Sequence, residues 1–155
     1  MQKITPFLWF DGKAEEAMNF YVSIFKNSKA GTVRRYGEGG PVPAGTAMSA
    51  SFELEGVQFH AFNGGPAFTF TPAISLFVDC QTQAEVDELW EKLSAGGEKS
   101  RCGWLKDKFG FSWQVAPDMT RWFNEKDKEK SDRAMQAMLQ MKKIDIAELD
   151  RAYAG

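Results

Sequence analysis

Two parts of the chain show the same order of hydrophobic patterns. Residues 4–11 and 72–79 are apolar, β-prone runs, and each of them ends in Asp. Each run is followed by apolar residues at three- and four-residue spacing, over residues 14–25 and 86–93, which is typical of one face of a helix. The two runs begin about 68 residues apart, so the pattern predicts one long internal repeat.

Three shorter β-prone runs follow each predicted helix, and turn-forming residues separate them. In chain order these runs cover residues 29–36, 46–54, 57–63, 98–101, 103–106 and 111–116. Each half therefore has the order β-α-β-β-β. The sequence predicts an α+β fold, in which repeats at about 3–66 and 71–117 form one domain over residues 1–117.

A single helix covers only one face of a sheet, so each βαβββ module is expected to leave its other face open. We expect the two sheets to pair and to form an open, cup-shaped mixed β-barrel with the helices outside. Period-two alternation assigns a set of mostly apolar positions to the helix side. They are Pro6, Leu8, Phe10, Val57, Phe59, Ala61, Ile74, Leu76, Val78, Phe111, Trp113 and Val115.

The alternate positions of the same strands are expected to line the cup. They are Thr5, Phe7, Trp9, Gln58, His60, Phe62, Ala73, Ser75, Phe77, Ser112, Gln114 and Ala116. This lining is mainly aromatic with a few polar groups, which is the usual composition of a small-molecule pocket.

Residues 118–155 lie beyond the repeat and are predicted to form a C-terminal helical extension. A helix is expected at about 129–142, with an apolar face that contains Met135, Met138 and Met141. This face suits packing against the core or against a second subunit. It also suits a lid that holds a ligand, because Met side chains adapt to irregular surfaces.

Short polar residues mark where helices and turns are expected to begin. Asp11, Thr82 and Asp145 each precede a helical pattern and are the expected N-caps. Asp107 opens the segment 107–110, which is expected to form a turn.

The composition excludes several classes of protein. A chain of 155 residues with 13 Phe and 5 Trp must bury these rings in its core or line a pocket with them. A net charge of −2 without a Lys/Arg-rich stripe gives no support for nucleic-acid binding. No apolar run approaches the roughly 18 residues of a membrane span, and no signal peptide is expected. The two cysteines do not suggest a disulfide framework, so a cytoplasmic location is expected.

His60 is the only histidine and is expected in the cup beside Gln114. It is a candidate general acid/base, or a hydrogen-bonding anchor for a polar ligand. The alternative is a histidine that is satisfied by neighbours inside the barrel. The aromatic residues predicted around it, Phe7, Trp9, Phe62, Phe77 and Trp104, either form a stacking surface for a flat ligand or fill the barrel.

Three further segments carry weaker candidates. Cys102 lies close to basic residues in the sequence, which would favour a reactive thiolate; the alternative, which we prefer, is a small half-buried residue at a turn. Cys80 ends an apolar strand and is expected to pack in the core. The segment Asn63-Gly64-Gly65-Pro66 either binds an anion through backbone amides or forms a plain turn.

Several separate blocks of the sequence resemble PhnB-like proteins, the "3-demethylubiquinone-9 3-methyltransferase-like" branch of the vicinal oxygen chelate superfamily. The blocks are residues 4–25, 63–66, 73–93, 102–117 and 137–147. The superfamily includes glyoxalase I, extradiol dioxygenases and bleomycin-resistance proteins, so the resemblance implies the duplicated βαβββ fold and a homodimer. It does not imply methyl transfer, because the chain has no glycine-rich loop that opens a helix after a strand.

The resemblance also implies where a metal would bind. Metal-dependent members of the superfamily carry their ligands on the first and last strand of each repeat, which here correspond to Thr5, His60, Ala73 and Gln114. Ala73 has no donor atom and Thr5 is a poor ligand, so no metal site and no cofactor are expected.

The sequence thus favours a small-molecule-binding protein with the vicinal oxygen chelate fold, without a conventional metal site. The expected ligand-binding residues are Thr5, Trp9, His60, Phe62, Ser75, Phe77 and Gln114. Two alternatives stay open. One is a dimer that sequesters a drug-like compound, as bleomycin-resistance proteins do, and the other is a metal-dependent glyoxalase- or dioxygenase-type enzyme.

Overall fold

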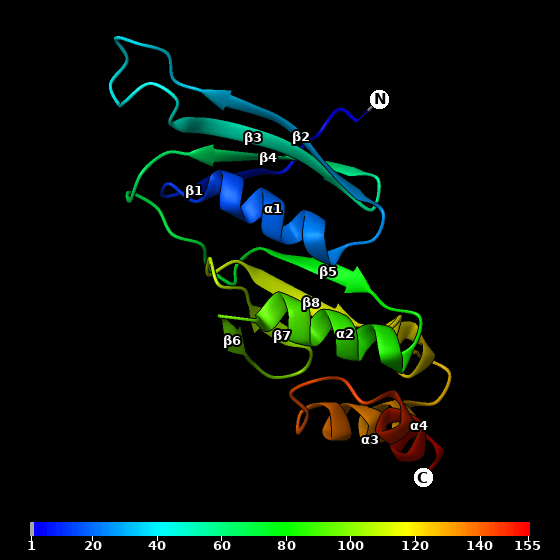
Figure 1. Cartoon of the computed structure of the whole chain (residues 1–155). Helices are drawn as coiled ribbons and strands as arrows, with labels where there is room; N and C mark the ends of the chain where they lie inside the picture. Colours follow the sequence, from blue (N-terminus) through cyan, green and yellow to red (C-terminus); the bar gives the residue numbers. More distant parts are fainter. Residues whose placement is uncertain (1) are drawn as a thin grey trace. The chain divides into compact units, whose positions relative to one another are not determined.

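The computed structural model describes residues 2–155, which form two compact units, residues 2–70 and 71–155 (Figure 1). We call them unit 1 and unit 2. Unit 1 contains β1 (Phe7–Phe10), α1 (Ala14–Ile24), β2 (Ser28–Arg35), β3 (Ala47–Leu54) and β4 (Val57–Asn63). Unit 2 contains β5 (Ser75–Asp79), α2 (Gln83–Ser94), β6 (Glu98–Lys99), β7 (Trp104–Lys106), β8 (Ser112–Ala116), the 3-10 turn η1 (Met119–Arg121), α3 (Lys128–Met138) and α4 (Ile146–Ala154).

The two units repeat one topology. Their sheets have the orders β1-β4-β3-β2 and β5-β8-β7-β6. In each sheet the first and last strands of the module pair in parallel, and the other neighbours are antiparallel. The predicted duplicated βαβββ fold is therefore confirmed. Each sheet is open and four-stranded, and the closure of both into one cup stays a prediction.

The core of unit 1 lies between α1 and one face of its sheet. Leu8, Phe10, Phe59 and Ala61 are buried on this face, as the alternation predicts. Phe52 stacks on Phe59 with ring centroids 5.4 Å apart. One residue assigned to this face departs from the prediction. Val57 is 42% exposed, because β4 begins there and the start of a strand extends beyond the cover of the helix.

Helix α1 is capped by a side chain from a distant strand. The predicted N-cap Asp11 is wrong, because the capping position is Lys13 and its side chain makes no capping bond. Instead, Asn63 at the end of β4 accepts a hydrogen bond at Oδ1 from the Ala14 N–H, at 2.9 Å. The Asn63 Nδ2 donates to the Ala47 carbonyl at 3.1 Å. This amide joins α1, β3 and β4, a tertiary contact that a search for local caps does not find.

The core of unit 2 follows the same plan. Thr82 caps α2 as predicted, with its Oγ1 accepting from the Glu85 N–H at 3.2 Å. The apolar face of α2 is buried, and so are the alternating residues Phe111, Trp113 and Val115 on and next to β8. Ile74 is 63% exposed rather than on the helix side, because it precedes the first residue of β5.

Asp107 organises the turn between β7 and β8. Its carboxylate is buried at 2% exposure and accepts hydrogen bonds at Oδ1 from the Phe109 and Phe111 N–H groups, at 2.9 and 3.0 Å. Its Oδ2 accepts from the Trp113 indole N–H at 2.9 Å. The expected turn is confirmed, and the buried charge is stable there because charge-assisted bonds replace its hydration.

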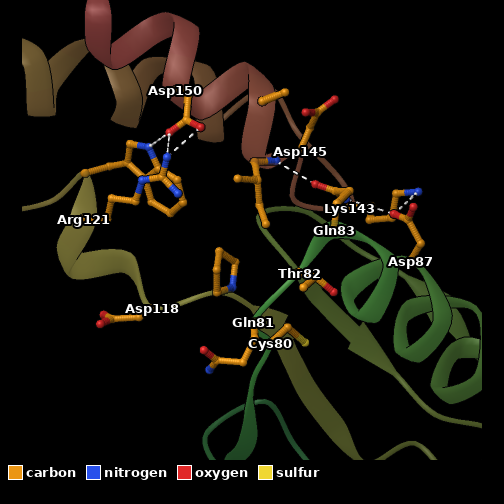
Figure 2. A pocket seen from close by; sticks show the side chains of 14 residues that line it. Cys80, Gln81, Thr82, Gln83, Asp87, Asp118, Arg121, Lys143, Asp145 and Asp150 are labelled. Carbon is orange, nitrogen blue, oxygen red and sulfur yellow. Dashed lines mark hydrogen bonds and ion pairs between the residues drawn. The ribbon is translucent and has the colours of Figure 1, made fainter.

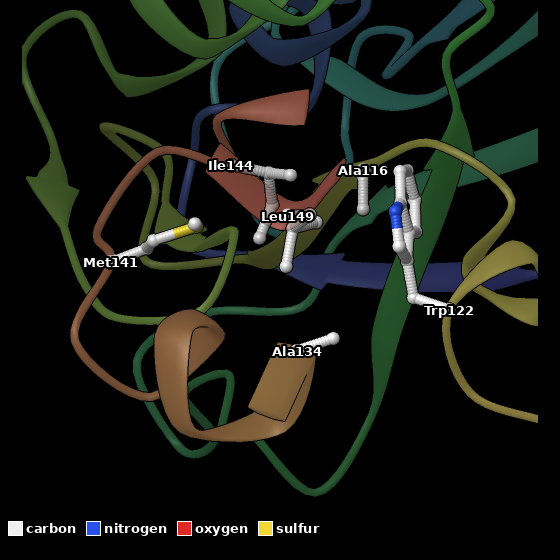
Figure 3. Close-up of a cluster of buried hydrophobic side chains, with 6 residues drawn as sticks. All are labelled: Ala116, Trp122, Ala134, Met141, Ile144 and Leu149. Carbon is white, nitrogen blue, oxygen red and sulfur yellow. The ribbon is translucent and has the colours of Figure 1, made fainter. Parts of the chain in front are cut away.

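The C-terminal segment 117–155 packs as a second hydrophobic layer on unit 2 (Figure 3). Its buried cluster consists of Ala116, Trp122, Ala134, Met141, Ile144 and Leu149. Ala116 was expected to line the cup, but this segment covers it. Helix α3 ends at Met138, four residues earlier than predicted, and Met141 packs from the connection to α4. The apolar stripe is therefore partly core, while Met135 and Leu139 stay exposed.

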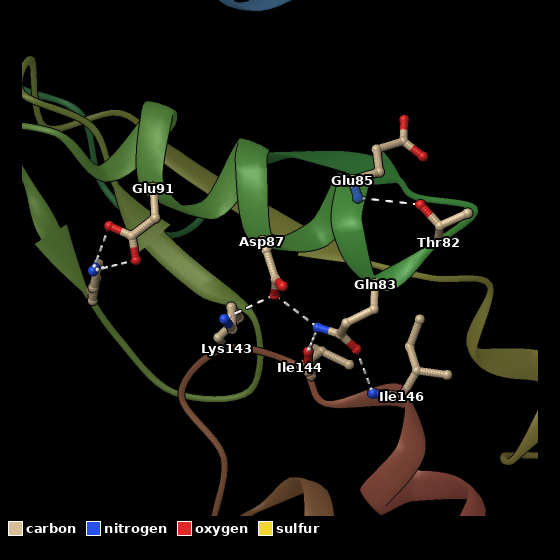
Figure 4. A network of polar contacts seen from close by, with 9 residues as sticks. Thr82, Gln83, Glu85, Asp87, Glu91, Lys143, Ile144 and Ile146 are labelled. Atoms are coloured by element: carbon tan, nitrogen blue, oxygen red, sulfur yellow. Dashed lines mark hydrogen bonds and ion pairs between the residues drawn. The ribbon is translucent and has the colours of Figure 1, made fainter.

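Polar contacts attach the C-terminal segment to α2 (Figure 4). The Gln83 Nε2 donates to the Ile144 carbonyl at 3.0 Å, and its Oε1 accepts from the Ile146 N–H at 2.8 Å. Nearby, the Lys143 ammonium lies 2.8 Å from the Asp87 carboxylate, which also accepts from Gln83 at 2.9 Å. The Gln83 side chain of α2 thus binds the backbone on either side of Asp145, the residue that precedes α4. The predicted cap of α4 is confirmed, since Asp145 accepts from the Glu148 N–H.

The contact between Asp87 and Lys143 is expected to make stability depend on pH. Hydrogen bonds from Lys143, and then from Gln83, lower the pKa of the Asp87 carboxyl below its ordinary value of 3.8. A carboxyl with a lowered pKa contributes stability above its ordinary pKa and loses the contribution as pH falls through the folded value. Asp87→Asn should therefore reduce the free energy of unfolding by less than about 1 kcal/mol at pH 7, since the pair is exposed.

This difference should disappear on acidification. Urea unfolding of wild type and Asp87→Asn from pH 7 to pH 2 measures it, with the exposed Asp11→Asn as the matched control. Curves for wild type and Asp87→Asn that keep the same separation at pH 2 would contradict the assignment of the charge effect to Asp87.

Candidate functional site

A row of aromatic rings lies on the face of β1 and β4 that α1 does not cover. The parallel register aligns Phe7 with His60 and Trp9 with Phe62. The ring centroids of Phe7 and His60 are 6.1 Å apart, those of Phe7 and Phe62 are 5.7 Å apart, and those of Trp9 and Phe62 are 5.5 Å apart. Phe68 extends the row with its centroid 5.0 Å from that of Trp9. We call these five residues the ring row.

The ring row is open to solvent at both ends. Phe7 is 62% exposed at the His60 end, and Phe68 is 66% exposed at the other. His60 is exposed, and among residues 2–155 its imidazole makes the ring contact with Phe7 but no hydrogen bond. The imidazole is therefore free to donate or accept a hydrogen bond beside a surface of aromatic rings.

The segment Asn63-Gly64-Gly65-Pro66 holds the centre of the ring row. The Trp9 Nε1 donates to the Gly65 carbonyl at 2.9 Å. A Cβ at Gly64 would lie 2.3 Å from Cζ2 of Trp9. The segment therefore has a structural role beside Trp9, since Gly64 makes room for the indole and the Gly65 carbonyl accepts its hydrogen bond.

Unit 2 carries a polar pair at the equivalent strands. The Gln114 Nε2 of β8 donates to the Ser75 Oγ of β5 at 3.0 Å. Phe77 is aligned with Gln114 across the parallel pair and is 50% exposed, and Trp104 of β7 is aligned with Gln114 on the other side. Ser112 was expected on the same surface, but it is buried, and its hydroxyl has no hydrogen-bond partner among residues 2–155.

The positions that correspond to metal ligands do not provide a suitable donor set. Thr5 and Ala73 each lie before the first residue of a strand, and the register aligns Phe7 rather than Thr5 with His60. Of the four positions only His60 carries a strong ligand for a divalent ion. Within the described residues, no group of three His, Cys, Asp or Glu side chains is placed to hold an ion. The absence of a metal from the protein stays a prediction, and we derive no chemistry through one.

The two cysteines have structural surroundings. Burial, and then the charges of Glu85 and Asp79, raise the pKa of the Cys80 thiol to about 12, so it stays protonated and a poor nucleophile. Cys102 is half-buried at a turn with φ of 57°, and its Sγ lies 3.5 Å from the Met138 carbonyl. Its backbone N–H donates to the Met141 carbonyl at 2.9 Å, so this turn supports the C-terminal segment.

The C-terminal segment also forms a cleft of about 640 Å³ with the ends of β5 and β8 (Figure 2). Its walls include Cys80, Pro117 and Trp122, and its rim carries Arg121 and several Asp side chains. Most of these charges have partners within the cleft. Arg121 pairs with Asp150 at 2.7 Å, and Asp150 also accepts from the Trp122 indole at 3.0 Å.

The sequence did not indicate this cleft. Its residues come from three separate segments, 80–87, 117–122 and 143–150, and no motif joins Asp87 to Lys143 or Arg121 to Asp150. The hydrogen bonds and ion pairs around it attach the C-terminal segment to the rest of unit 2. These contacts explain the polar residues of the cleft by their structural role, and no ligand is needed to account for them.

None of the helices in residues 2–155 combines the length and the apolar character that a membrane span requires.

The comparisons with known proteins agree with the duplicated fold. A family model described as 3-demethylubiquinone-9 3-methyltransferase matches residues 2–116. A PhnB protein from Bacillus cereus is 44% identical, with a TM-score of 0.69, and the match covers 74% of this chain and 99% of that chain. The protein PA1353 from Pseudomonas aeruginosa is 21% identical with a TM-score of 0.62, over 76% and 98% of the two chains, and supports the fold alone.

No curated protein matches the chain. The family model stops at residue 116, so it includes neither the C-terminal segment nor the block 137–147 that contributed to the predicted resemblance. The residues of the ring row and the Ser75–Gln114 pair all lie within the matched part.

Proposed function

Because the chain belongs to the 3-demethylubiquinone-9 3-methyltransferase family of PhnB-like proteins, within the vicinal oxygen chelate superfamily, we propose that it binds a small organic ligand without a conventional metal site. The observation that carries this proposal is the ring row, which ends in a solvent-exposed imidazole. A contiguous patch of exposed apolar side chains commonly marks an interaction or ligand-binding surface.

The proposal assigns Trp9 and Phe62 to apolar contact with the ligand and His60 to its polar group. Aromatic side chains contribute large contact areas at a low cost in side-chain entropy, because they have few rotatable bonds. Thr5, Ser75, Phe77 and Gln114 are proposed as further ligand-binding residues. Support for the last three comes from the exposure of Phe77 and from the Ser75–Gln114 hydrogen bond, which orients two polar groups on one strand pair.

His60 is also proposed as a general acid/base if the ligand is a substrate. An imidazole ring has one nitrogen that can give a proton and one that can take it, so it is suited to proton transfer. The alternative function is sequestration of a drug-like compound without turnover. Analysis of the bound compound after incubation distinguishes the two functions. An enzyme changes the compound chemically, whereas a sequestering protein releases it unchanged.

Thermal unfolding in the presence of metabolites and drug-like compounds tests the proposal. A ligand that binds the folded state at a hundred times its Kd should stabilise it by about 2.7 kcal/mol. We expect His60→Ala to weaken the response while it leaves the unfolding of the free protein nearly unchanged, because His60 is exposed. The exposed Lys29→Ala on β2 is the matched control.

Several outcomes would contradict this function. A response that is equal in wild type and His60→Ala would remove His60 from the site. A stoichiometric divalent ion in the purified protein would favour the metal-dependent alternative. If no compound stabilises the protein, small-molecule binding by the ring row is wrong.

The proposal includes a homodimer, as the resemblance implies, and a cytoplasmic location, as the two cysteines without a disulfide framework lead us to expect. Light scattering on the purified protein gives the subunit number, and cell fractionation gives the location.

A further inference from the structure

Gly64 provides the space in which the benzene part of the Trp9 indole lies. A Cβ on Gly64 would be 2.3 Å from Cζ2 and 2.4 Å from both Cε2 and Cη2 of Trp9. These distances are far below van der Waals contact. The φ angle of Gly64 is outside the left-handed region, so the glycine is required for space and not for backbone conformation.

The pyrrole part of the same indole is held by a hydrogen bond. The Trp9 Nε1 donates to the Gly65 carbonyl at 2.9 Å. The acceptor segment is itself attached to the sheet and to α1, because the Gly64 N–H donates to the Phe10 carbonyl at 2.9 Å and Asn63 joins Ala14 to Ala47. Both ends of the indole therefore rest on backbone that has little freedom to move.

The held indole determines the angles within the ring row. Trp9 meets Phe62 at an interplanar angle of 66° and Phe68 at 77°, which are edge-to-face contacts on two sides. Aromatic pairs in this arrangement gain about 0.5–1.5 kcal/mol beyond area burial. An indole that rotated freely would lose this order, and the exposed Phe68 would lose the neighbour that orients it.

We propose that Gly64 and Gly65 are positioning residues of the ring row, and that the orientation they impose on Trp9 selects a planar aromatic ligand. This inference rests on the proposed function and names its ligand class. A planar ring can stack on, or place its edge against, ring faces that are already ordered. A saturated molecule of similar size is thicker and has no quadrupole to complement them. Because the ring row is ordered before the ligand binds, ordering its side chains does not reduce the free energy of binding.

A matched pair of probes tests the ligand class. 2-Naphthol and its saturated analogue decahydro-2-naphthol share one hydroxyl and one two-ring carbon frame, but only the first is planar and aromatic. Calorimetry should show that the wild-type protein binds 2-naphthol about tenfold more tightly than the saturated analogue. NMR should show a shift of the Trp9 indole N–H on addition of 2-naphthol.

A matched pair of glycine variants tests the positioning role. Gly64→Ala forces the indole out of its position and should reduce the preference for 2-naphthol to about twofold or less. Gly37→Ala is the control, because a Cβ there meets nothing within 4 Å and φ is outside the left-handed region. This control should keep the wild-type preference and the wild-type indole N–H shift.

A double variant separates positioning from general destabilisation. Phe at position 9 lacks the atoms that a Cβ at position 64 would meet, so adding Gly64→Ala to Trp9→Phe should change neither the thermal stability nor the probe preference further. If Gly64→Ala alone fails to fold, Trp9→Phe alone still tests the role of the Gly65 hydrogen bond, and it should also reduce the preference.

The outcomes distinguish this inference from the proposed function. Equal binding of the two probes by the wild-type protein overturns the planar aromatic class. A Gly64→Ala or Trp9→Phe protein that is folded and keeps the full preference overturns the positioning role. If the wild-type protein binds neither probe but is stabilised by another compound in a His60-dependent way, the inference fails and the proposed function stands. If no compound binds, both fail.

Discussion

Replacing Asp107 with Ala is expected to lower the free energy of unfolding by about 3–5 kcal/mol, the largest effect of any single side chain in the β7–β8 turn. The carboxylate accepts hydrogen bonds from two backbone N–H groups and from the Trp113 indole. Its removal leaves three donors in a buried site without this acceptor. Each buried donor without a partner costs about 1–3 kcal/mol, reduced where water can enter.

Two further variants separate the contributions of the carboxylate. Asp107→Asn keeps one oxygen for the backbone donors but presents an amide N–H₂ to the Trp113 N–H, so a smaller loss of about 1–3 kcal/mol is expected. Trp113→Phe removes the indole donor, and in that background Asp107→Asn should cost less. Urea unfolding at pH 7 measures all of these, and an Asp107→Ala protein within about 0.5 kcal/mol of wild type would contradict the account.

Trp122→Ala is expected to cost about 3–5 kcal/mol and to loosen the C-terminal segment before the rest of unit 2 unfolds. Trp122 is 1% exposed in the cluster that covers Ala116, and its indole N–H donates to Asp150. The exposed Leu139→Ala is the matched control and should cost less than about 0.5 kcal/mol.

Limited proteolysis followed by mass spectrometry locates the effect of Trp122→Ala. We expect new cleavage sites within residues 118–155 at a protease concentration that leaves wild type and Leu139→Ala intact. Cleavage that begins in unit 1, or a protein as resistant as wild type, would contradict the role of Trp122 in attaching this segment.

Much of the fold could be predicted because its elements are amphipathic in a regular way. The period-two pattern placed Phe59, Ala61, Trp113 and Val115 against the helices, and each of them is buried. The pattern failed at strand starts, as at Val57, because alternation gives the direction of a side chain but not the extent of the helix that covers it.

Contacts between distant segments were missed for a different reason. Asn63 rather than Asp11 caps α1, and Gln83 binds the backbone around Lys143 about sixty residues later. Amide side chains carry both a donor and an acceptor, so they can bind water at the surface or a distant backbone group equally well. Their sequence neighbours do not show which of the two applies.

Part of the candidate site could also be predicted. The alternation placed Phe7, Trp9, His60 and Phe62 on one face of unit 1, where they form the ring row together with Phe68, which was not predicted. It did not reveal that Gly64 and Gly65 position Trp9, because a double glycine after a strand first suggests a turn. The sequence feature that could have indicated this contact is the combination of Trp9 in one predicted strand with two glycines directly after the strand that pairs with it.

The contact made by Gln83 bears on how the sequence varies among relatives. Its amide makes the two hydrogen bonds that a neighbouring strand would make with the backbone of Ile144 and Ile146. The choice of residue at position 83 is therefore expected to depend on the C-terminal segment, although the position lies in α2. Homologues that end near residue 116 lack these two backbone partners and should accept many polar residues at this position. Homologues that retain the segment should keep Gln at this position. Across genomes, the presence of the C-terminal segment should therefore correlate with Gln at the position that corresponds to residue 83.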